Sequence, residues 1–165
     1  MSGVGELGAT AVPTSEEISR FYAVYGETLD EARLTEWSDF FAENCLYQII
    51  ARENYENGYG LCTMQADSKG MILDRVQGIL RTQRFGPRYC RRFYSGTRVC
   101  GVEDPVIKVR QNVLLIQTLI DQTSQILLCG VAHDQLIRQG DRLLFKQRIV
   151  VADSELIENS LIYPI

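Results

Sequence analysis

The chain has 165 residues, a formal net charge of −4 and 45% hydrophobic residues. This length and composition suit one globular domain with its own core, and they exclude a disordered or polybasic chain. The acidic balance argues against nucleic acid as the main partner. Because no apolar run is long enough for a transmembrane helix, we expect no membrane partner, and the cysteine usage favours reduced thiols in a cytoplasmic location.

The counts of cysteine and histidine limit the metal chemistry of the chain. Five cysteines, none with CxxC spacing, favour reduced thiols over a disulfide framework. A Rieske cluster needs two histidines and two cysteines, and a mononuclear iron site of the two-histidine, one-carboxylate kind also needs two histidines. The single histidine, His133, cannot supply either set, so we expect no metal and no cofactor in this chain.

The N-terminal third predicts an arm followed by two helices. Residues 1–13 are rich in glycine and predict a flexible arm, which leaves 14–165 as a single domain. Thr14 or Ser15 can cap a first helix, with Glu17 completing a capping box. A short second helix is expected over 34–41, capped by Thr35, with Trp37, Phe40 and Phe41 as core aromatics.

The remainder predicts a strand, a helix and then mostly strands. The strand is expected over 45–53, where Arg52, Glu53 and Asn54 end it, and the helix over 67–84, capped by Asp67 or Ser68. Further strands are expected at 97–103, 105–121, 124–139 and 142–154. The turn-forming residues at 121–124 and 138–141 predict that the last three strands form an antiparallel meander.

The apolar pattern of these strands predicts how the sheet is covered. The strand at 124–139 is apolar on both faces, which favours helices on one face and a ligand cavity or another subunit on the other. In the last strand, strict alternation places Arg148 on the wetter face. We therefore expect an α+β, cone-shaped fold of the nuclear-transport-factor-2-like (cystatin-like) kind, with a curved antiparallel sheet wrapped around a long helix. Isomerases, dehydratases and structural subunits share this fold, so it does not fix a function.

Several side chains are candidates for acid–base chemistry in such a cone. They are Tyr22, Asp39, Tyr47, His133 and Asp134. The commoner roles are a core tyrosine for Tyr22, a helix-surface carboxylate for Asp39 and a buried or interface histidine for His133. His133 and Asp134 are adjacent in a strand and point to opposite faces, so they cannot form a dyad. The alternative function that remains open is a free-standing isomerase or dehydratase using Tyr22, Asp39 or His133.

The segment 81–98 combines six arginines with four aromatic residues. Taken alone, this composition suits an anion or nucleic acid. In an acidic chain without a second basic patch, it favours a protein interface, where Arg and Tyr are enriched. A partner-binding module without an enzymatic context is a further possibility.

Four motifs in order carry a family resemblance: WSDFFAENCLYQIIARENYENGYGLC, DSKGMILDRVQGI, RYCRRFYSGTRV and NSLIYPI. Together they resemble the small (beta) subunit of Rieske-type aromatic-ring-hydroxylating oxygenases over residues 16–165. Within that family the chain looks most like the small subunits of salicylate 5-hydroxylase-type enzymes, with terephthalate dioxygenase as a more distant relative.

The resemblance implies an assembly of three large and three small subunits. The large (alpha) subunit would carry the Rieske 2Fe-2S cluster, the mononuclear iron and the substrate pocket, and ferredoxin and reductase would act through it. The small subunit would associate with its own copies as a trimer and have a structural role without independent activity. The substrate of the complex would be an aromatic acid, salicylate-like or a related benzoate.

The resemblance also implies that this chain has no catalytic, cofactor-binding or metal-binding residues but has subunit contacts. The expected contact residues are Arg52, Glu53, Asn54, Arg91, Arg92, Tyr163 and Pro164. The chain departs from the family pattern at one segment of this set. Many relatives have a histidine in the R-x-x-[RH]-[RH] segment, where this chain has the two arginines at 91 and 92.

Overall fold

The computed structural model describes residues 12–81, 86–156 and 163–165. The helices are α1 (Ser15–Asp30), α2 (Leu34–Trp37), the 3-10 helix η1 (Ser38–Phe40), α3 (Arg52–Glu56) and α4 (Lys69–Arg81). The strands are β1 (Phe41–Ala51), β2 (Cys62–Ala66), β3 (Arg88–Glu103), β4 (Val106–Leu119), β5 (Gln125–Gln139) and β6 (Arg142–Ala152).

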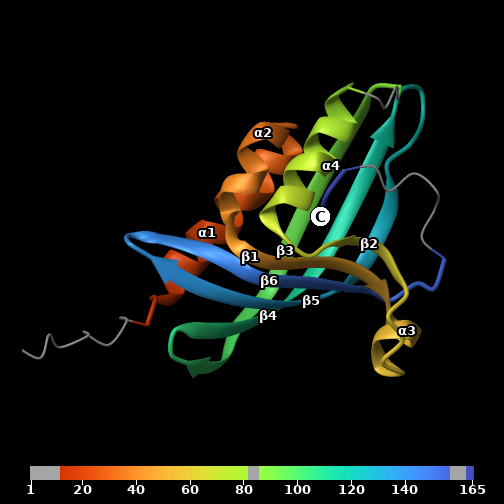
Figure 1. Ribbon diagram of the computed structural model, residues 1–165. Helices are drawn as coiled ribbons and strands as arrows, with labels where there is room; N and C mark the ends of the chain where they lie inside the picture. The colour runs from red at the N-terminus through yellow and green to blue at the C-terminus, as the bar shows by residue number, and fades with distance from the viewer. Residues whose placement is uncertain (1–11, 82–85, 157–162) are drawn as a thin grey trace, which may run out of the picture.

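The six strands form one curved sheet in the order β2-β1-β6-β5-β4-β3. Strands β4, β5 and β6 form the predicted antiparallel meander, and β3 extends it by pairing antiparallel with β4. The sheet bends around α1, α2 and α4, while α3 stands apart at the end of β1, and the C-terminus lies inside the cone (Figure 1). The expected α+β cone is confirmed, with one difference: β1 pairs with β6 in parallel.

Local capping signals explain where two helices begin. Thr14 and Glu17 form the predicted capping box at the start of α1. Ser68 accepts a hydrogen bond from the backbone N–H of Met71 at the start of α4. The short helix predicted from residue 34 is present as α2 followed by η1, but the predicted Thr35 cap was wrong, because the helix begins before Thr35 and has no side-chain cap, and Phe41 already belongs to β1.

Two other predicted elements need correction. Strand β3 begins at Arg88 instead of 97, because the basic segment alternates between exposed residues and residues that face the core. Strand β1 ends at Ala51, so Arg52, Glu53 and Asn54 start the short helix α3 and do not end a strand. The arm predicted over 1–13 lies outside the described residues except for positions 12 and 13.

The core fills the space between the helices and the concave face of the sheet. Trp37 and Phe41 are fully buried within it and pack edge-to-face on one another, and Phe40 packs against the cluster, as predicted for these aromatics. Gly130 allows a close approach of β5 to β6, since a Cβ at this position would overlap the carbonyl oxygen of Val151. The opposite, convex face of β3, β4 and β5 has no helix over most of its length in the described residues.

Candidate functional site and subunit surfaces

An ion pair lies at the centre of the cone. Asp134 on β5 and Arg148 on β6 occupy opposite positions in the antiparallel register, and both side chains are fully buried. The Tyr22 hydroxyl donates to the same Asp134 oxygen at 2.7 Å as the Arg148 guanidinium does at 2.6 Å. Burial raises the pKa of the Asp134 carboxyl to about 6, while Arg148 and the Tyr22 hydroxyl lower it. Burial also raises the pKa of Tyr22 well above its ordinary value.

Aromatic rings surround the guanidinium of this ion pair. Its carbon lies 4.8 Å from the ring centroid of Tyr25, 5.3 Å from that of Tyr94 and 5.1 Å from that of Phe145. Such cation–π contacts are stronger away from water. The sequence pattern placed Arg148 on the wetter face, which was wrong. Between the pairs Gln135–Gln147 and Leu136–Phe145, β6 has one extra residue, Lys146, which interrupts its alternation, so Phe145 and Arg148 both point inward.

The three residues of the free-standing enzyme hypothesis do not share a site. Tyr22 of α1 is buried beside Asp134. Asp39 lies in η1 on the surface. His133 lies on the opposite face of the sheet from Asp134, as predicted, and stacks on Tyr55 of α3 with ring centroids 5.4 Å apart. Tyr47, the other tyrosine candidate, is buried and binds the C-terminal residues.

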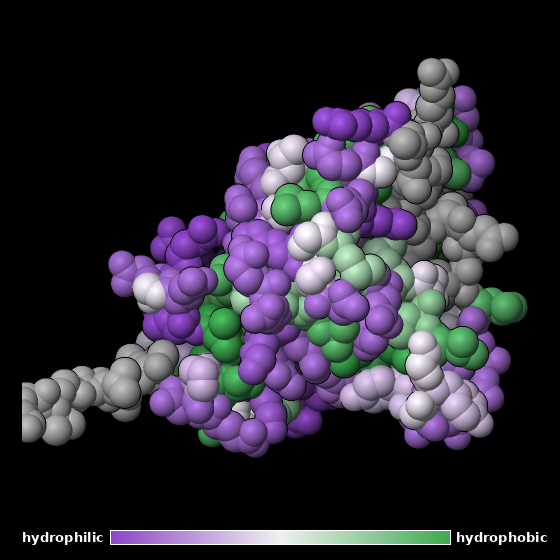
Figure 2. Space-filling model, viewed as in Figure 1, coloured by the Kyte–Doolittle hydropathy of each residue, from purple (hydrophilic) through white to green (hydrophobic). Residues whose placement is uncertain are grey.

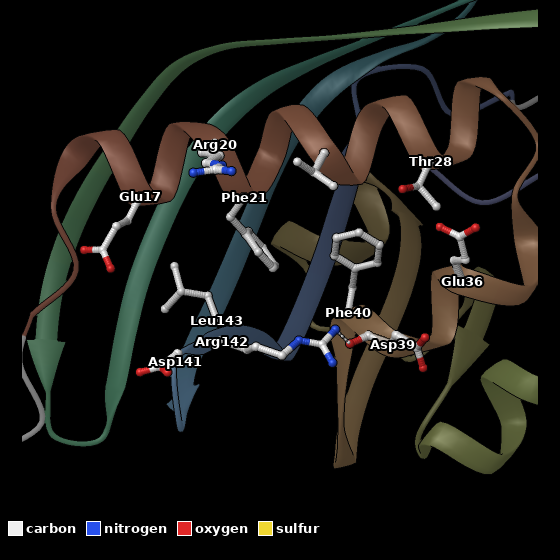
Figure 3. A pocket seen from close by; sticks show the side chains of 11 residues that line it. Glu17, Arg20, Phe21, Thr28, Glu36, Asp39, Phe40, Asp141, Arg142 and Leu143 are labelled. Atoms are coloured by element: carbon white, nitrogen blue, oxygen red, sulfur yellow. Dashed lines mark hydrogen bonds between the residues drawn. The ribbon is translucent and has the colours of Figure 1, made fainter.

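A groove of about 610 Å³ runs along α1 beside the β5–β6 turn (Figure 3). Its apolar wall includes Phe21, Phe40 and Leu143, and Asp39 lies at its edge. The guanidinium of Arg142 binds the backbone oxygen of Asp39 at 3.2 Å. Among the described residues, no second acid–base side chain in this groove forms a hydrogen bond with the Asp39 carboxylate. The groove therefore does not contain an assembled catalytic pair.

A second groove, of about 480 Å³, separates α1 from β3. Two adjacent arginines behave differently beside it. The buried guanidinium of Arg92 binds the Asp30 carboxylate at 2.6 Å, whereas the exposed guanidinium of Arg91 lies 3.9 Å from it. Alternation along β3 explains the difference, because Arg92 faces the core and Arg91 faces outward.

The convex face of the sheet exposes apolar side chains that are neighbours across three strands. Phe93, Leu114 and Cys129 are neighbours across β3, β4 and β5, and Arg91, Ile116 and Ile126 form the adjacent row. Phe93 is 53% exposed and Ile126 is 67% exposed. We call the apolar members of these two rows, together with Tyr89 and Val131, the outer patch. In Figure 2, by contrast, the visible face carries mostly hydrophilic side chains with smaller apolar areas between them.

The short helix α3 is held against the end of the sheet. Arg52 forms an ion pair with Asp153, which follows β6. The Asn54 side chain donates to the Leu61 carbonyl at 3.0 Å and closes the turn towards β2. Arg52 and Glu53 remain exposed and Asn54 is half-buried.

The C-terminal residues 163–165, called the C-terminal tripeptide below, lie inside the cone. The carbonyl oxygen of Ile165 accepts from the Tyr25 hydroxyl at 2.8 Å, from Arg148 Nε at 3.2 Å and from the Tyr47 hydroxyl at 3.4 Å. The Pro164 carbonyl oxygen accepts from Arg92 Nε at 3.2 Å and from Arg92 Nη2. Pro164 and Ile165 are buried and Tyr163 is half-buried.

Two findings concern metals and membranes. Within 12–81, 86–156 and 163–165, no group of three or more His, Cys, Asp and Glu side chains is placed to hold a metal ion. No helix in the described part of the chain is long and apolar enough to cross a membrane.

Comparison with known proteins identifies the family. Residues 26–159 match the family described as ring hydroxylating beta subunit. The chain belongs to this family. It is 27% identical over 137 residues to the anthranilate 1,2-dioxygenase small subunit of Burkholderia cepacia, an alignment that covers 83% of this chain and 85% of that protein.

Solved structures agree with the family and the fold. A crystal structure assigned to the beta subunit of an aromatic-ring-hydroxylating dioxygenase from Novosphingobium aromaticivorans has a TM-score of 0.83 and 32% identity, with 91% of this chain and 95% of that chain covered. A chain from the same organism, assigned as a scytalone dehydratase, has a TM-score of 0.65 and 20% identity, with 84% and 83% covered. The second likeness shows the shared nuclear-transport-factor-2-like fold alone.

Five of the seven residues expected at subunit contacts of this beta subunit fall into two groups, while Asn54 and Tyr163 are half-buried. Arg52, Glu53 and Arg91 are exposed. Arg92 and Pro164 are buried and hydrogen-bonded to one another inside the chain. Contact of either group with another subunit stays a prediction, and the exposed group is the one available at the surface of the isolated beta subunit.

Sequence reasoning missed the part played by Arg148 and Asp30. No local signal identified the buried arginine, because its burial depends on the irregular register of β6. A charged residue at the end of α1 is ordinarily solvated, and only the packing of β3 beside the helix gives Asp30 its buried partner. The cationic character of the segment 81–98 was visible, but not which arginine turns inward.

Proposed function

We propose that this chain is the non-catalytic small subunit of a multicomponent Rieske non-heme iron oxygenase. The complex hydroxylates an aromatic acid, salicylate-like or a related benzoate, and catalysis resides in the large subunit. Two observations support this: the acid–base candidates Tyr22, Asp39 and His133 lie in three separate places, and one histidine cannot ligate either iron centre. The Burkholderia cepacia relative is named for anthranilate, itself an aromatic acid.

The outer patch is the observation that carries the assembly role. Exposed apolar surface of this kind marks a protein interface, because water contact with several adjacent apolar side chains is unfavourable. The exposed Arg91 lies in the same row as Ile116 and Ile126, and arginine is enriched in interfaces beside aromatic residues. We infer that this face and α3 contact neighbouring subunits in an assembly of three large and three small subunits in the cytoplasm. Electrons from ferredoxin and reductase then enter through the large subunit.

The test is purification of the tagged beta subunit from its native host, with three measurements on the product. They are the mass of the assembly, its iron content and its visible absorption. We expect a larger partner that contains iron and has the absorption of an iron–sulfur cluster. A colourless, iron-free homo-oligomer that turns over a substrate by itself would instead support the free-standing isomerase or dehydratase.

A matched pair of substitutions tests the interface itself. Phe93→Asp places a charge in the outer patch, whereas Leu73→Asp places one at a similarly exposed apolar residue of α4, 43% exposed against 53%. We expect the first substitution to release the iron-containing partner or reduce the mass of the assembly, and the second to leave both unchanged. Retention of a full assembly by folded Phe93→Asp would contradict the assigned surface.

A further inference from the structure

Side chains from four different elements bind the backbone of the C-terminal tripeptide. Tyr25 comes from α1, Tyr47 from β1, Arg92 from β3 and Arg148 from β6. The Ile165 N–H donates to the Tyr47 hydroxyl at 2.8 Å. Proline has no N–H, and the Pro164 carbonyl oxygen, the Ile165 N–H and the Ile165 carbonyl oxygen each have a side-chain partner.

This arrangement differs from ordinary secondary structure. A segment in a sheet is satisfied by the backbone of a neighbouring strand, whereas here each polar group of Pro164 and Ile165 meets a side chain that other elements position. Trp37 Nε1 donates to the Tyr25 hydroxyl at 3.1 Å and thereby fixes that hydroxyl from a further element. The donors are therefore positioned by the cone and not by the segment they bind.

The electric charge of the site decides what kind of group it accepts. Arg148 is already paired with Asp134, and Arg92 is already paired with Asp30. The four charges balance, so the site offers several hydrogen-bond donors with no net positive charge. Arg148 Nη2 is buried and has no hydrogen-bond partner, which leaves one further donor in the cone. Such a site suits a carbonyl or carboxylate oxygen attached to an apolar group, as in Ile165, whose side chain is fully buried.

We propose that the interior of the cone is a binding site for a short apolar segment with a carbonyl or carboxylate oxygen, and that the chain fills it with its own Pro164 and Ile165. Covalent attachment gives the tripeptide an effective concentration of about millimolar, so it excludes weaker ligands in trans. Withdrawal of the tripeptide exposes the same donors to an equivalent group from another molecule. This inference rests on the geometry of the cone and is independent of the oxygenase assignment.

The first test uses the full chain with Ile165→Asp, which places a charge where the buried isoleucine lies and so weakens the hold on the tripeptide. The probe is a fluorescein-labelled Tyr-Pro-Ile peptide, in free-acid and amidated forms, and the readout is fluorescence anisotropy. We expect saturable binding to Ile165→Asp and none to the unmodified chain at the same concentrations. Binding of both forms identifies carbonyl recognition, and binding of the free acid alone identifies carboxylate recognition.

Two further substitutions in the Ile165→Asp background show which groups hold the probe. Tyr47→Phe removes the hydroxyl that contacts both the N–H and the carbonyl of Ile165, and we expect about tenfold weaker binding. Tyr94→Phe is the matched control, because the buried Tyr94 hydroxyl has no hydrogen-bond partner and so makes no hydrogen bond to the tripeptide. Equal affinity of the two variants would overturn the assignment of the donors.

A second protein covers the case in which Ile165→Asp does not fold. A protease site inserted between Glu155 and Leu156, where Leu156 is 88% exposed, allows the chain to be cut after folding. We expect the cut protein to keep its circular dichroism spectrum and to exchange the released segment for the labelled peptide. A folded cut protein that neither releases the segment nor binds the probe would show that the tripeptide is an integral part of the core, and the proposal would be wrong.

Discussion

Arg148 and Asp134 face one another on adjacent strands and form a fully buried ion pair with a nitrogen–oxygen distance of 2.6 Å. Arg148 also binds the carbonyl oxygen of Ile165 and lies among aromatic rings. A buried pair gains Coulomb energy but loses hydration, so its net contribution to stability is small, whereas one partner left alone is strongly destabilising. This pair consequently organises the interior of the cone more than it stabilises it.

We predict that Arg148→Met lowers the free energy of unfolding by about 3–5 kcal/mol, because it leaves the Asp134 carboxyl buried without its cation. Adding Asp134→Leu to the same chain should recover a large part of this loss, since the carboxyl that lost its cation is then removed as well. Urea unfolding of the two variants and the unmodified chain measures both values. A double variant less stable than Arg148→Met would contradict this account of the pair.

Gly130→Ala should be among the most destabilising single-methyl additions in the chain. The added Cβ would overlap the Val151 carbonyl oxygen, and two strand backbones would have to move apart to admit it. We expect a loss of unfolding free energy of about 2 kcal/mol or more, in the range found for overpacked cores. Gly78→Ala in α4 is the control, because nothing lies within 4 Å of its added Cβ. Replacing a helical glycine there should stabilise the chain by up to about 1 kcal/mol, and thermal unfolding of both variants separates the two effects.

The single histidine, His133, makes a contribution to the free energy of unfolding that depends on pH. Burial, and after it the positive charge of Arg110, lowers the pKa of His133 in the folded state below its usual value of about 6.5. The unfolded chain therefore binds the proton at this residue more readily, and the contribution of His133 to the free energy of unfolding falls as the pH drops below about 6.5. Stability from this group is fully present above that pH.

The measurement for this prediction is urea unfolding of the unmodified chain and of His133→Gln between pH 5 and pH 8. We expect the difference in stability between the two proteins to change below about pH 6.5 and to stay constant above it. His133→Phe retains a ring to stack on Tyr55 and separates loss of the charge from loss of the stack. Parallel pH profiles for all three proteins would show that His133 does not titrate differently in the folded and unfolded states.

The sequence by itself determined much of the fold. The capping box at Thr14 and Glu17, the turn-forming residues of the meander and the apolar pattern of β5 each act over a few residues, so their outcome can be inferred locally. The four motifs carried the family, which the match over residues 26–159 confirmed. The histidine count, which needs no structure, restricted the metal chemistry that this chain can support.

Only the tertiary structure decided which charged residues are internal. Arg92 and Arg91 are adjacent and chemically identical, yet one binds Asp30 in the interior and the other is exposed. Arg148 turns inward because the register of β6 shifts, and the C-terminal tripeptide enters the cone because residues far apart in the chain supply its hydrogen bonds. Burial of a charge depends on partners brought together by the whole fold, and local sequence patterns contain no record of those partners.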